Sequence, residues 1–124
     1  MSRKRHPYTK RLKLIKAGTG TEYISDEPVK DGRVVVLRVI SAENKTSALT
    51  KIRFGKKTGG FFLPWAEQKA PAANELVFSD DIEHWIRQGE FFQAELVGGA
   101  ANDECWVYLD GYWFTWNGDE ADVL

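Results

Sequence analysis

Sulfur is scarce in this sequence of 124 residues, which contains one methionine and one cysteine, Cys105. A single cysteine excludes a disulfide within the chain, and this predicts a protein made in a reducing cytoplasm. A zinc site needs about four Cys or His ligands. The sequence offers only His6, His84 and Cys105, which are scattered along the chain. We therefore expect no metal site and no cofactor, and we expect Cys105 to be a small buried residue.

Long apolar runs are also missing, so no segment is predicted to cross a membrane. The basic start of the chain is not followed by the apolar stretch of a secretory signal. No nucleophile elbow occurs, and the acidic residues after Glu75 lack the regular spacing of a calcium loop. A carboxylate pair for glycoside hydrolysis is the least excluded enzymatic alternative. We predict no catalytic residues, a non-enzymatic protein and no membrane partner.

Acidic residues are missing from the N-terminal end of the chain and basic residues are nearly missing from the C-terminal end, although the formal net charge of the whole chain is only -1. Residues 1–21 carry seven Lys or Arg and no acid, whereas residues 70–124 carry twelve Asp or Glu and a single base, Arg87. This asymmetry is typical of an arm that binds a partner, although a solvated basic terminus gives the same pattern. The arm residues predicted to bind a partner are Arg3, Lys4, Arg5, Lys10, Arg11 and Lys13.

Short runs of aromatic and β-branched residues, separated by Gly, Asp, Asn or Ser, predict consecutive antiparallel strands. Four such runs follow one another between Glu75 and Phe114. Residues 33–42 form the most apolar run, which predicts a central strand covered on both faces. In residues 10–16 leucines alternate with basic residues, which predicts an edge strand. Residues 55–60 have the composition of a flexible cationic loop.

Roughly eight or nine short strands and no amphipathic helix predict an all-β fold, a two-layer antiparallel β-sandwich. We expect a jelly-roll-like arrangement of two four-stranded sheets, with an immunoglobulin-like sandwich as the alternative. The predicted organisation is an extended basic N-terminal arm at residues 1–9, a sandwich domain at residues 10–116 and a frayed acidic C-terminus at residues 117–124.

Aromatic residues are more numerous in the second half of the sequence than one small core requires. In residues 112–116 both faces of the predicted strand carry rings. Most rings would fill the space between the sheets, and the remainder would meet protein or stack on sugar. We expect Tyr112, Trp113 and Trp116 to form this contact surface, with Trp113 and Trp116 the most exposed.

Four segments share a rhythm of short strands and tight turns, namely residues 72–78, 82–86, 89–90 and 109–112. This rhythm, over about residues 30–114, resembles the small β-sandwich structural proteins of tailed bacteriophage virions. Those proteins serve as head decoration, minor capsid, or neck and tail components. The resemblance implies a non-enzymatic protein that is present in many copies in the virion and is assembled in the host cytoplasm.

The resemblance implies that the partners are further copies of the chain and the neighbouring major capsid, portal or tail proteins. Packaged DNA near the arm is a further partner, because each lysine or arginine adds salt-sensitive affinity for phosphate. The main alternative is a carbohydrate-binding β-sandwich module that binds glycan through the C-terminal aromatic residues. A nucleic-acid binder driven by the arm is a third alternative, which the acidic character of the folded part disfavours.

Overall fold

The computed structural model describes residues 4–79 and 83–116, and their regular structure consists of β-strands. No helix that could span a membrane occurs in these residues. The acidic segment predicted to fray, residues 117–124, lies outside the described residues. The strands in chain order are β1 (His6–Ile15), β2 (Glu22–Ser25), β3 (Arg33–Asn44), β4 (Lys51–Thr58), β5 (Phe61–Lys69), β6 (Val77–Ser79), β7 (His84–Arg87), β8 (Phe91–Val97) and β9 (Glu104–Thr115).

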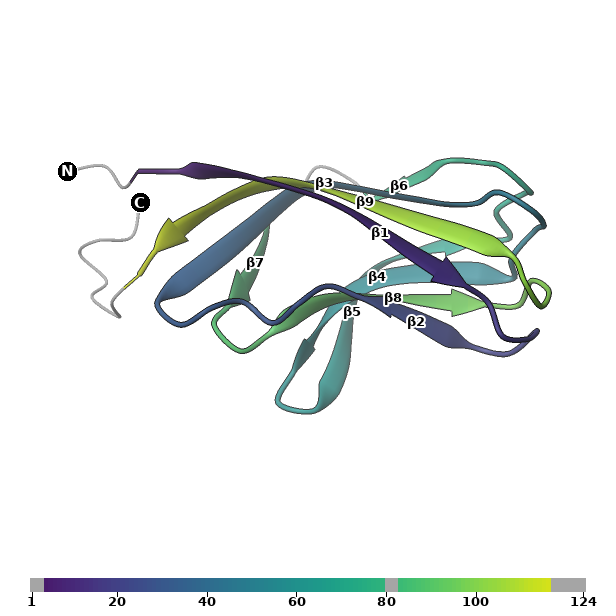
Figure 1. The fold of residues 1–124 in the computed structure, drawn as a ribbon, viewed down its shortest axis with the longest axis horizontal. Helices are drawn as coiled ribbons and strands as arrows, with labels where there is room; N and C mark the ends of the chain where they lie inside the picture. The colour runs from purple at the N-terminus through teal and green to yellow at the C-terminus, as the bar shows by residue number, and fades with distance from the viewer. Residues whose placement is uncertain (1–3, 80–82, 117–124) are drawn as a thin grey trace.

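Two antiparallel sheets lie face to face and form a sandwich (Figure 1). Sheet A has the order β1-β9-β3-β6, with β7 also pairing β3, and sheet B has the order β2-β8-β4-β5. The last strand returns to lie beside the first, and β6 and β7 share one edge of β3. This is the order of a jelly roll in which β6 and β7 together form one interrupted edge strand. The predicted two-layer antiparallel sandwich is therefore confirmed, and its strand order is jelly-roll-like.

The core lies between the two sheets and is built from alternate residues of each strand, as the two-residue period of a strand requires. β3, in the middle of sheet A, contributes Leu37 and Ile40, and β4 contributes Phe54 from sheet B. Cys105 is buried in this core, as predicted. Burial raises the pKa of its thiol to about 11, so the thiol is protonated at neutral pH.

The first strand begins at His6, whereas the sequence pattern placed its start at Lys10. All ten of its residues pair with β9 of the same chain. Residues 6–9 therefore belong to sheet A, because their backbone groups pair with β9. The alternation of leucine and lysine had predicted the strand only from Lys10 onward. Of the predicted arm, Lys4 and Arg5 are the described residues that precede the sandwich.

A β-bulge in β3 is matched by a glycine in β9. The register between the two strands shifts between Leu37 and Val39, which makes Arg38 the extra residue. A Cβ on Gly111, which pairs with Leu37, would lie 1.9 Å from the carbonyl oxygen of Val36. A residue without a side chain is required where two backbones approach this closely.

A second bulge, between β4 and β5, corrects the prediction of a cationic loop at residues 55–60. Most of this segment continues β4, and the turn is confined to Gly59 and Gly60. The register between the strands shifts at Gly55, where a Cβ would lie 2.2 Å from the carbonyl oxygen of Leu63. Glycine here serves strand pairing, and composition alone does not distinguish that role from a flexible loop.

The Gly111→Ala substitution is expected to lower the free energy of unfolding by about 2–3 kcal/mol, because the added methyl group collides with backbone that cannot move aside. Gly18→Ala is the matched control, since nothing lies within 4 Å of a Cβ there, and its effect should stay within about 0.5 kcal/mol. Urea denaturation of the two variants measures both values. Equal stability of the two variants would contradict the close approach at the bulge.

Candidate functional site

The outward side of sheet A, turned away from sheet B, holds several of the side chains that the sequence singled out. Paired residues of neighbouring strands lie on the same face of a sheet, so the strand register defines this surface. We call it the outer face. Its residues are Thr9, Arg11, Lys13, Ile15, Val39, Ser41, Glu43, Phe78, Glu104, Trp106, Tyr108 and Asp110.

Two of the predicted arm cations lie on the outer face against rings of their own chain. The guanidinium of Arg11 is 5.5 Å and the ammonium of Lys13 is 5.3 Å from the ring centre of Trp106. Lys13 also lies 3.5 Å from the carboxylate of Glu104, and the rings of Trp106 and Tyr108 stack with centres 6.3 Å apart. Exposed contacts of this kind contribute little to stability, because water and salt screen them. The opposite charges of the two chain ends therefore meet within one sheet.

A hollow of about 450 Å³ lies on the outer face, beside the β3 bulge. After the bulge the alternation of β3 is reversed, and Val39 points outward with 46% of its surface exposed. Phe78 on β6 is 50% exposed on the same face. Sequence reasoning missed both residues, because Val39 is one of a continuous run of apolar residues. The hollow is lined by Thr9, Lys10, Arg11, Val39, Ser41, Tyr108, Leu109 and Asp110.

Tyr112 and Trp116 lie on the same side of sheet A as the outer face but beyond the bulge. They belong to a second apolar cluster, in which Tyr112 is buried and Trp116 is partly buried. The guanidinium of Arg5 lies 4.3 Å from the ring centre of Tyr112, and that of Arg87 lies 4.4 Å from the ring centre of Trp116. Both predicted contact rings are thus covered by arginines.

Trp113 is adjacent to Tyr112 in sequence but points to the opposite side of sheet A, toward the core. Its ring stacks on His6 with centres 4.1 Å apart, and the guanidinium of Arg33 lies 3.9 Å from its ring centre. The structure therefore does not bring Tyr112, Trp113 and Trp116 together on one surface.

The other arm residues divide between solvent and the sandwich edge. Lys4 is exposed, and Arg3 lies outside the described residues. Lys10 points inward, and its ammonium lies 3.6 Å from the buried carboxylate of Asp26. The hydroxyl of Tyr8 donates a hydrogen bond to the same carboxylate. Burial and this carboxylate raise the pKa of Tyr8, so its hydroxyl remains protonated.

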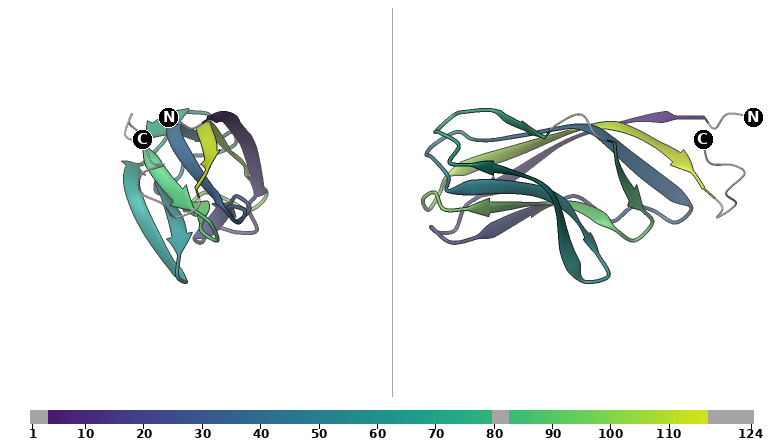
Figure 2. Two further views of the ribbon diagram at one scale, coloured as in Figure 1. Left: turned by 90° about the vertical axis from the view of Figure 1, so that its left-hand side faces the viewer. Right: turned by 180° about the vertical axis from the view of Figure 1, so that it is seen from behind.

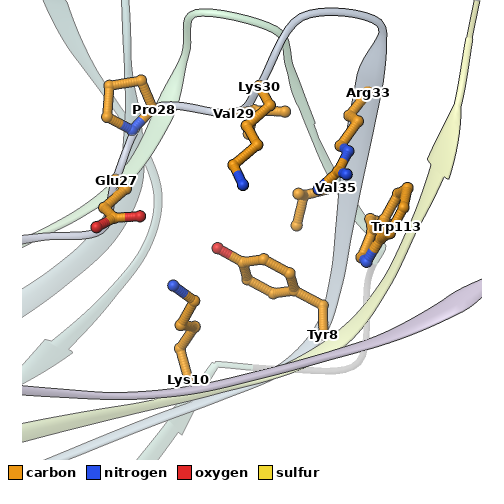
Figure 3. Close-up of a pocket in the computed structure, with 9 residues that line it drawn as sticks. All are labelled: Tyr8, Lys10, Glu27, Pro28, Val29, Lys30, Arg33, Val35 and Trp113. Atoms are coloured by element: carbon orange, nitrogen blue, oxygen red, sulfur yellow. The ribbon is translucent and has the colours of Figure 1, made fainter.

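A cleft of about 210 Å³ lies next to these residues, and Figure 3 shows the side chains that surround it. Its walls come from β1, the β2–β3 loop, β3 and β9. Sequence reasoning did not predict this cleft, because its residues are far apart in the chain and no local pattern joins them. The lining residues are Tyr8, Lys10, Glu27, Pro28, Val29, Lys30, Arg33, Val35 and Trp113.

The hairpin of β4 and β5 carries the most exposed large apolar side chain of the described residues. Phe61, directly after the turn, is 75% exposed, and Leu63 is 48% exposed. Figure 2 shows the hairpin end standing away from the sandwich, on the side opposite to sheet A. Strand composition predicted this segment as a short apolar strand but gave no sign that its end projects from the body.

No protein-family model matches this sequence, and no curated protein matches it. Among solved structures, a chain of the Bacillus endospore appendages, which form disulfide-linked pili, aligns over 92% of each chain with a TM-score of 0.44 and 10% identity. A chain of infectious bursal disease virus Gx strain aligns over 96% of this chain and 35% of its own length, with a TM-score of 0.42 and 12% identity.

The N-terminal cellulose-binding domain of Cellulomonas fimi β-1,4-glucanase C aligns over 90% of this chain and 88% of its own, with a TM-score of 0.36 and 13% identity. The likeness is one of β-sandwich architecture. At these identities and scores it supports no argument about function.

A buried polar cluster closes the end of the sandwich where β1 ends and β9 begins. The carboxylate of Asp103 accepts hydrogen bonds from the Ser47 hydroxyl, from the side-chain amide of Asn44 (2.8 Å) and from the backbone amide of Ala100 (2.8 Å). Lys16 is also buried, and its backbone amide donates to the carbonyl of Asp103 at 2.9 Å. Burial alone raises the pKa of Asp103, but these hydrogen bonds and the charge of Lys16 outweigh it and lower the pKa.

The His84 ring lies between the two sheets and is partly buried. Burial lowers its pKa, so the ring is neutral at pH 7. The ring stacks on Trp65 with centres 4.1 Å apart, which joins β7 of sheet A to β5 of sheet B. No group of three or more His, Cys, Asp or Glu residues that could hold a metal occurs within residues 4–79 and 83–116.

The Asp103→Asn substitution is expected to lower the free energy of unfolding by about 2 kcal/mol at pH 7, because an amide cannot accept all three hydrogen bonds. The lowered pKa means that the carboxylate stabilises the fold above its unfolded pKa of about 3.9, and that this contribution is lost as the pH falls through the folded value. The stability difference between wild type and variant should therefore shrink in acid. Thermal unfolding from pH 7 down to about pH 3 tests this. Asp110→Asn on the exposed outer face is the control, and a difference for Asp103→Asn that is constant over the range would contradict the assignment.

Proposed function

We propose that this chain is a non-enzymatic structural protein that assembles in many copies. The assembly is a tailed-bacteriophage virion, in which the chain serves as a capsid decoration, minor capsid or neck component. The jelly-roll order supports this at the level of fold alone, because viral capsid proteins and lectins both use it. The observation that carries the proposal is a pair of apolar surfaces on opposite layers of one sandwich.

The first surface is the end of the β4–β5 hairpin, where Phe61 and Leu63 are exposed. Their partners on β4 are the polar residues Thr58 and Lys56, and neither Phe61 nor Leu63 belongs to the core cluster. Large exposed apolar and aromatic side chains are typical anchors of protein–protein contacts. Insertion of these two side chains into a neighbour removes them from water.

The second surface is the hollow on the outer face, whose lining includes Val39, Tyr108 and Arg11. Its mixture of an aliphatic residue, a tyrosine and an arginine is characteristic of interface centres. The hollow belongs to sheet A, whereas the hairpin belongs to sheet B and projects away from it (Figures 1 and 2). Two different surfaces on opposite sides generate a head-to-tail contact, which builds rings or stacks of many copies. The hairpin of one copy therefore occupies the hollow of the next.

In this proposal the N-terminal strand is part of the sandwich and is not a free arm that binds a partner. β1 completes sheet A in its own chain, and its cations Arg11 and Lys13 border the surface that receives the neighbour. The carbohydrate alternative relied on three C-terminal rings as one stacking surface. Those rings lie on two sides of sheet A, so stacking on a common surface is not part of the proposal.

Two variants test the head-to-tail contact. The double substitution Phe61→Ser with Leu63→Ser removes the hairpin anchors, and Val39→Glu places a charge in the hollow. Each variant by itself is expected to be monomeric at concentrations at which the wild type associates, because each lacks one half of every contact. Analytical ultracentrifugation of the full chain measures the mass.

A mixture of the two variants provides the control. The intact hollow of the hairpin variant and the intact hairpin of the Val39→Glu variant form one contact, so the mixture should yield a one-to-one dimer and no larger species. Thr19→Glu, on an exposed loop, should associate as the wild type does. A wild type that is monomeric at every concentration overturns the proposal, and so does a mixture that fails to form the dimer.

A further inference from the structure

The cleft at the end of the sandwich where β1 begins has an excess of positive charge. Lys10, Lys30 and Arg33 line it, against one lining carboxylate, that of Glu27. Lys10 is engaged with Asp26 at the cleft edge. Among the described residues, Lys30 and Arg33 have no carboxylate partner, and two unneutralised cations on one wall attract an anion.

Arg33 is oriented before any ligand arrives. Its guanidinium lies 3.9 Å from the ring centre of Trp113, and the opposite neighbour of that ring is His6. Stacking uses the flat face of a guanidinium and leaves the N–H groups at its edge free to donate. A planar fork of donors held in place matches the two oxygens of a carboxylate.

The wall opposite β1 is formed by the β2–β3 loop, which is tied to its surroundings by backbone hydrogen bonds. The amide of Val29 donates to the carbonyl of Glu90 at 2.8 Å, and the amide of Gly89 donates to the carbonyl of Val29 at 2.9 Å. The amide of Arg33 donates to the carbonyl of Lys30 at 3.1 Å. These bonds fix the backbone that carries both cations, so the cleft is largely formed without a ligand and the entropic cost of binding is small.

The rest of the lining specifies more than an anion. Val29, Val35 and the Tyr8 ring provide an apolar surface, and Figure 3 shows the Tyr8 hydroxyl, the Lys10 ammonium and the Glu27 carboxylate facing the same space. A carboxylate such as that of Glu27 accepts hydrogen bonds from hydroxyl groups. The volume of about 210 Å³ is below the range of sites for drug-sized ligands, so one ring fits and a long chain does not.

We propose that this cleft binds a sugar acid, a single hydroxylated ring that carries one carboxylate. The carboxylate lies against Arg33 and Lys30, a hydroxyl donates to Glu27, and one face of the ring packs on Val29 and Tyr8. No residue of the hairpin lines this site, and Lys10 is the one residue that it shares with the hollow, whereas Lys30 and Arg33 line the site alone. Binding and self-association are therefore measured independently.

The test is titration of the full chain with glucuronate, followed by changes in two-dimensional amide NMR spectra, with glucose as the neutral control. Glucuronate should bind at least about tenfold more tightly than glucose, because only the acid uses the charge-assisted hydrogen bonds. The shifted amides should be those of the β2–β3 loop and the first half of β1. Arg33→Met and Lys30→Met should each weaken glucuronate binding at least about tenfold and leave glucose unchanged.

Arg38→Met is the matched control, because Arg38 lies on the same strand with 58% of its side chain exposed and outside the cleft. It should bind glucuronate as the wild type does. Lys30 is exposed, so its variant keeps the fold, and a thermal melt checks the Arg33 variant. Equal binding of acetate and glucuronate would overturn the sugar part of the proposal. Equal binding of glucuronate and glucose, or binding that Lys30→Met does not change, would overturn the site itself.

Discussion

The antiparallel pairing of β1 with β9 is the interaction on which the rest of this structure depends. It runs from the pair His6–Trp113 to the pair Ile15–Glu104 and joins the two ends of the described sandwich in one sheet. The pairing brings the basic N-terminal segment against the acidic C-terminal half, so the charges that are separated in sequence are neighbours in space. The outer face and the cleft both contain residues from β1 and β9, and neither exists without this pairing.

The two bulges decide which side chains are offered to a partner. The extra residue in β3 reverses its alternation, which turns Val39 outward and creates the hollow. The register between β4 and β5 shifts at Gly55, and beyond this shift the end of the hairpin turns away from the body (Figure 2). Each bulge is paired with a glycine, Gly111 or Gly55, because a side chain there would enter the neighbouring backbone. Both halves of the proposed contact, the hollow and the hairpin end, thus lie next to a bulge that requires a glycine.

The two ends of the sandwich have different chemistry for a physical reason. At one end Asp103 and Lys16 are buried and hydrogen-bonded: the Asp103 carboxylate accepts from the Asn44 amide, and the Lys16 ammonium donates to the carbonyl of Gly20 at 2.8 Å. At the other end a cleft lies beside the β2–β3 loop, and Arg33 and Lys30 remain without carboxylate partners among the described residues. Charges that are satisfied internally stabilise the fold, whereas charges that are held in place but unpaired are available for a ligand.

The sequence by itself determined the strands, because alternation and turn residues are local signals. It placed Leu12 and Leu14 opposite Arg11 and Lys13 and identified β3 as central, and the structure contains both features. It did not determine the partner of the basic segment, since a charge excess is the same whether the acidic surface is on another molecule or on β9. The tertiary structure alone decided that Arg5 covers Tyr112 and that Val39 is exposed. It alone also placed Arg33 and Lys10 around one cleft. The reason is that strand register, bulges and the packing of the two layers join residues that no local pattern connects.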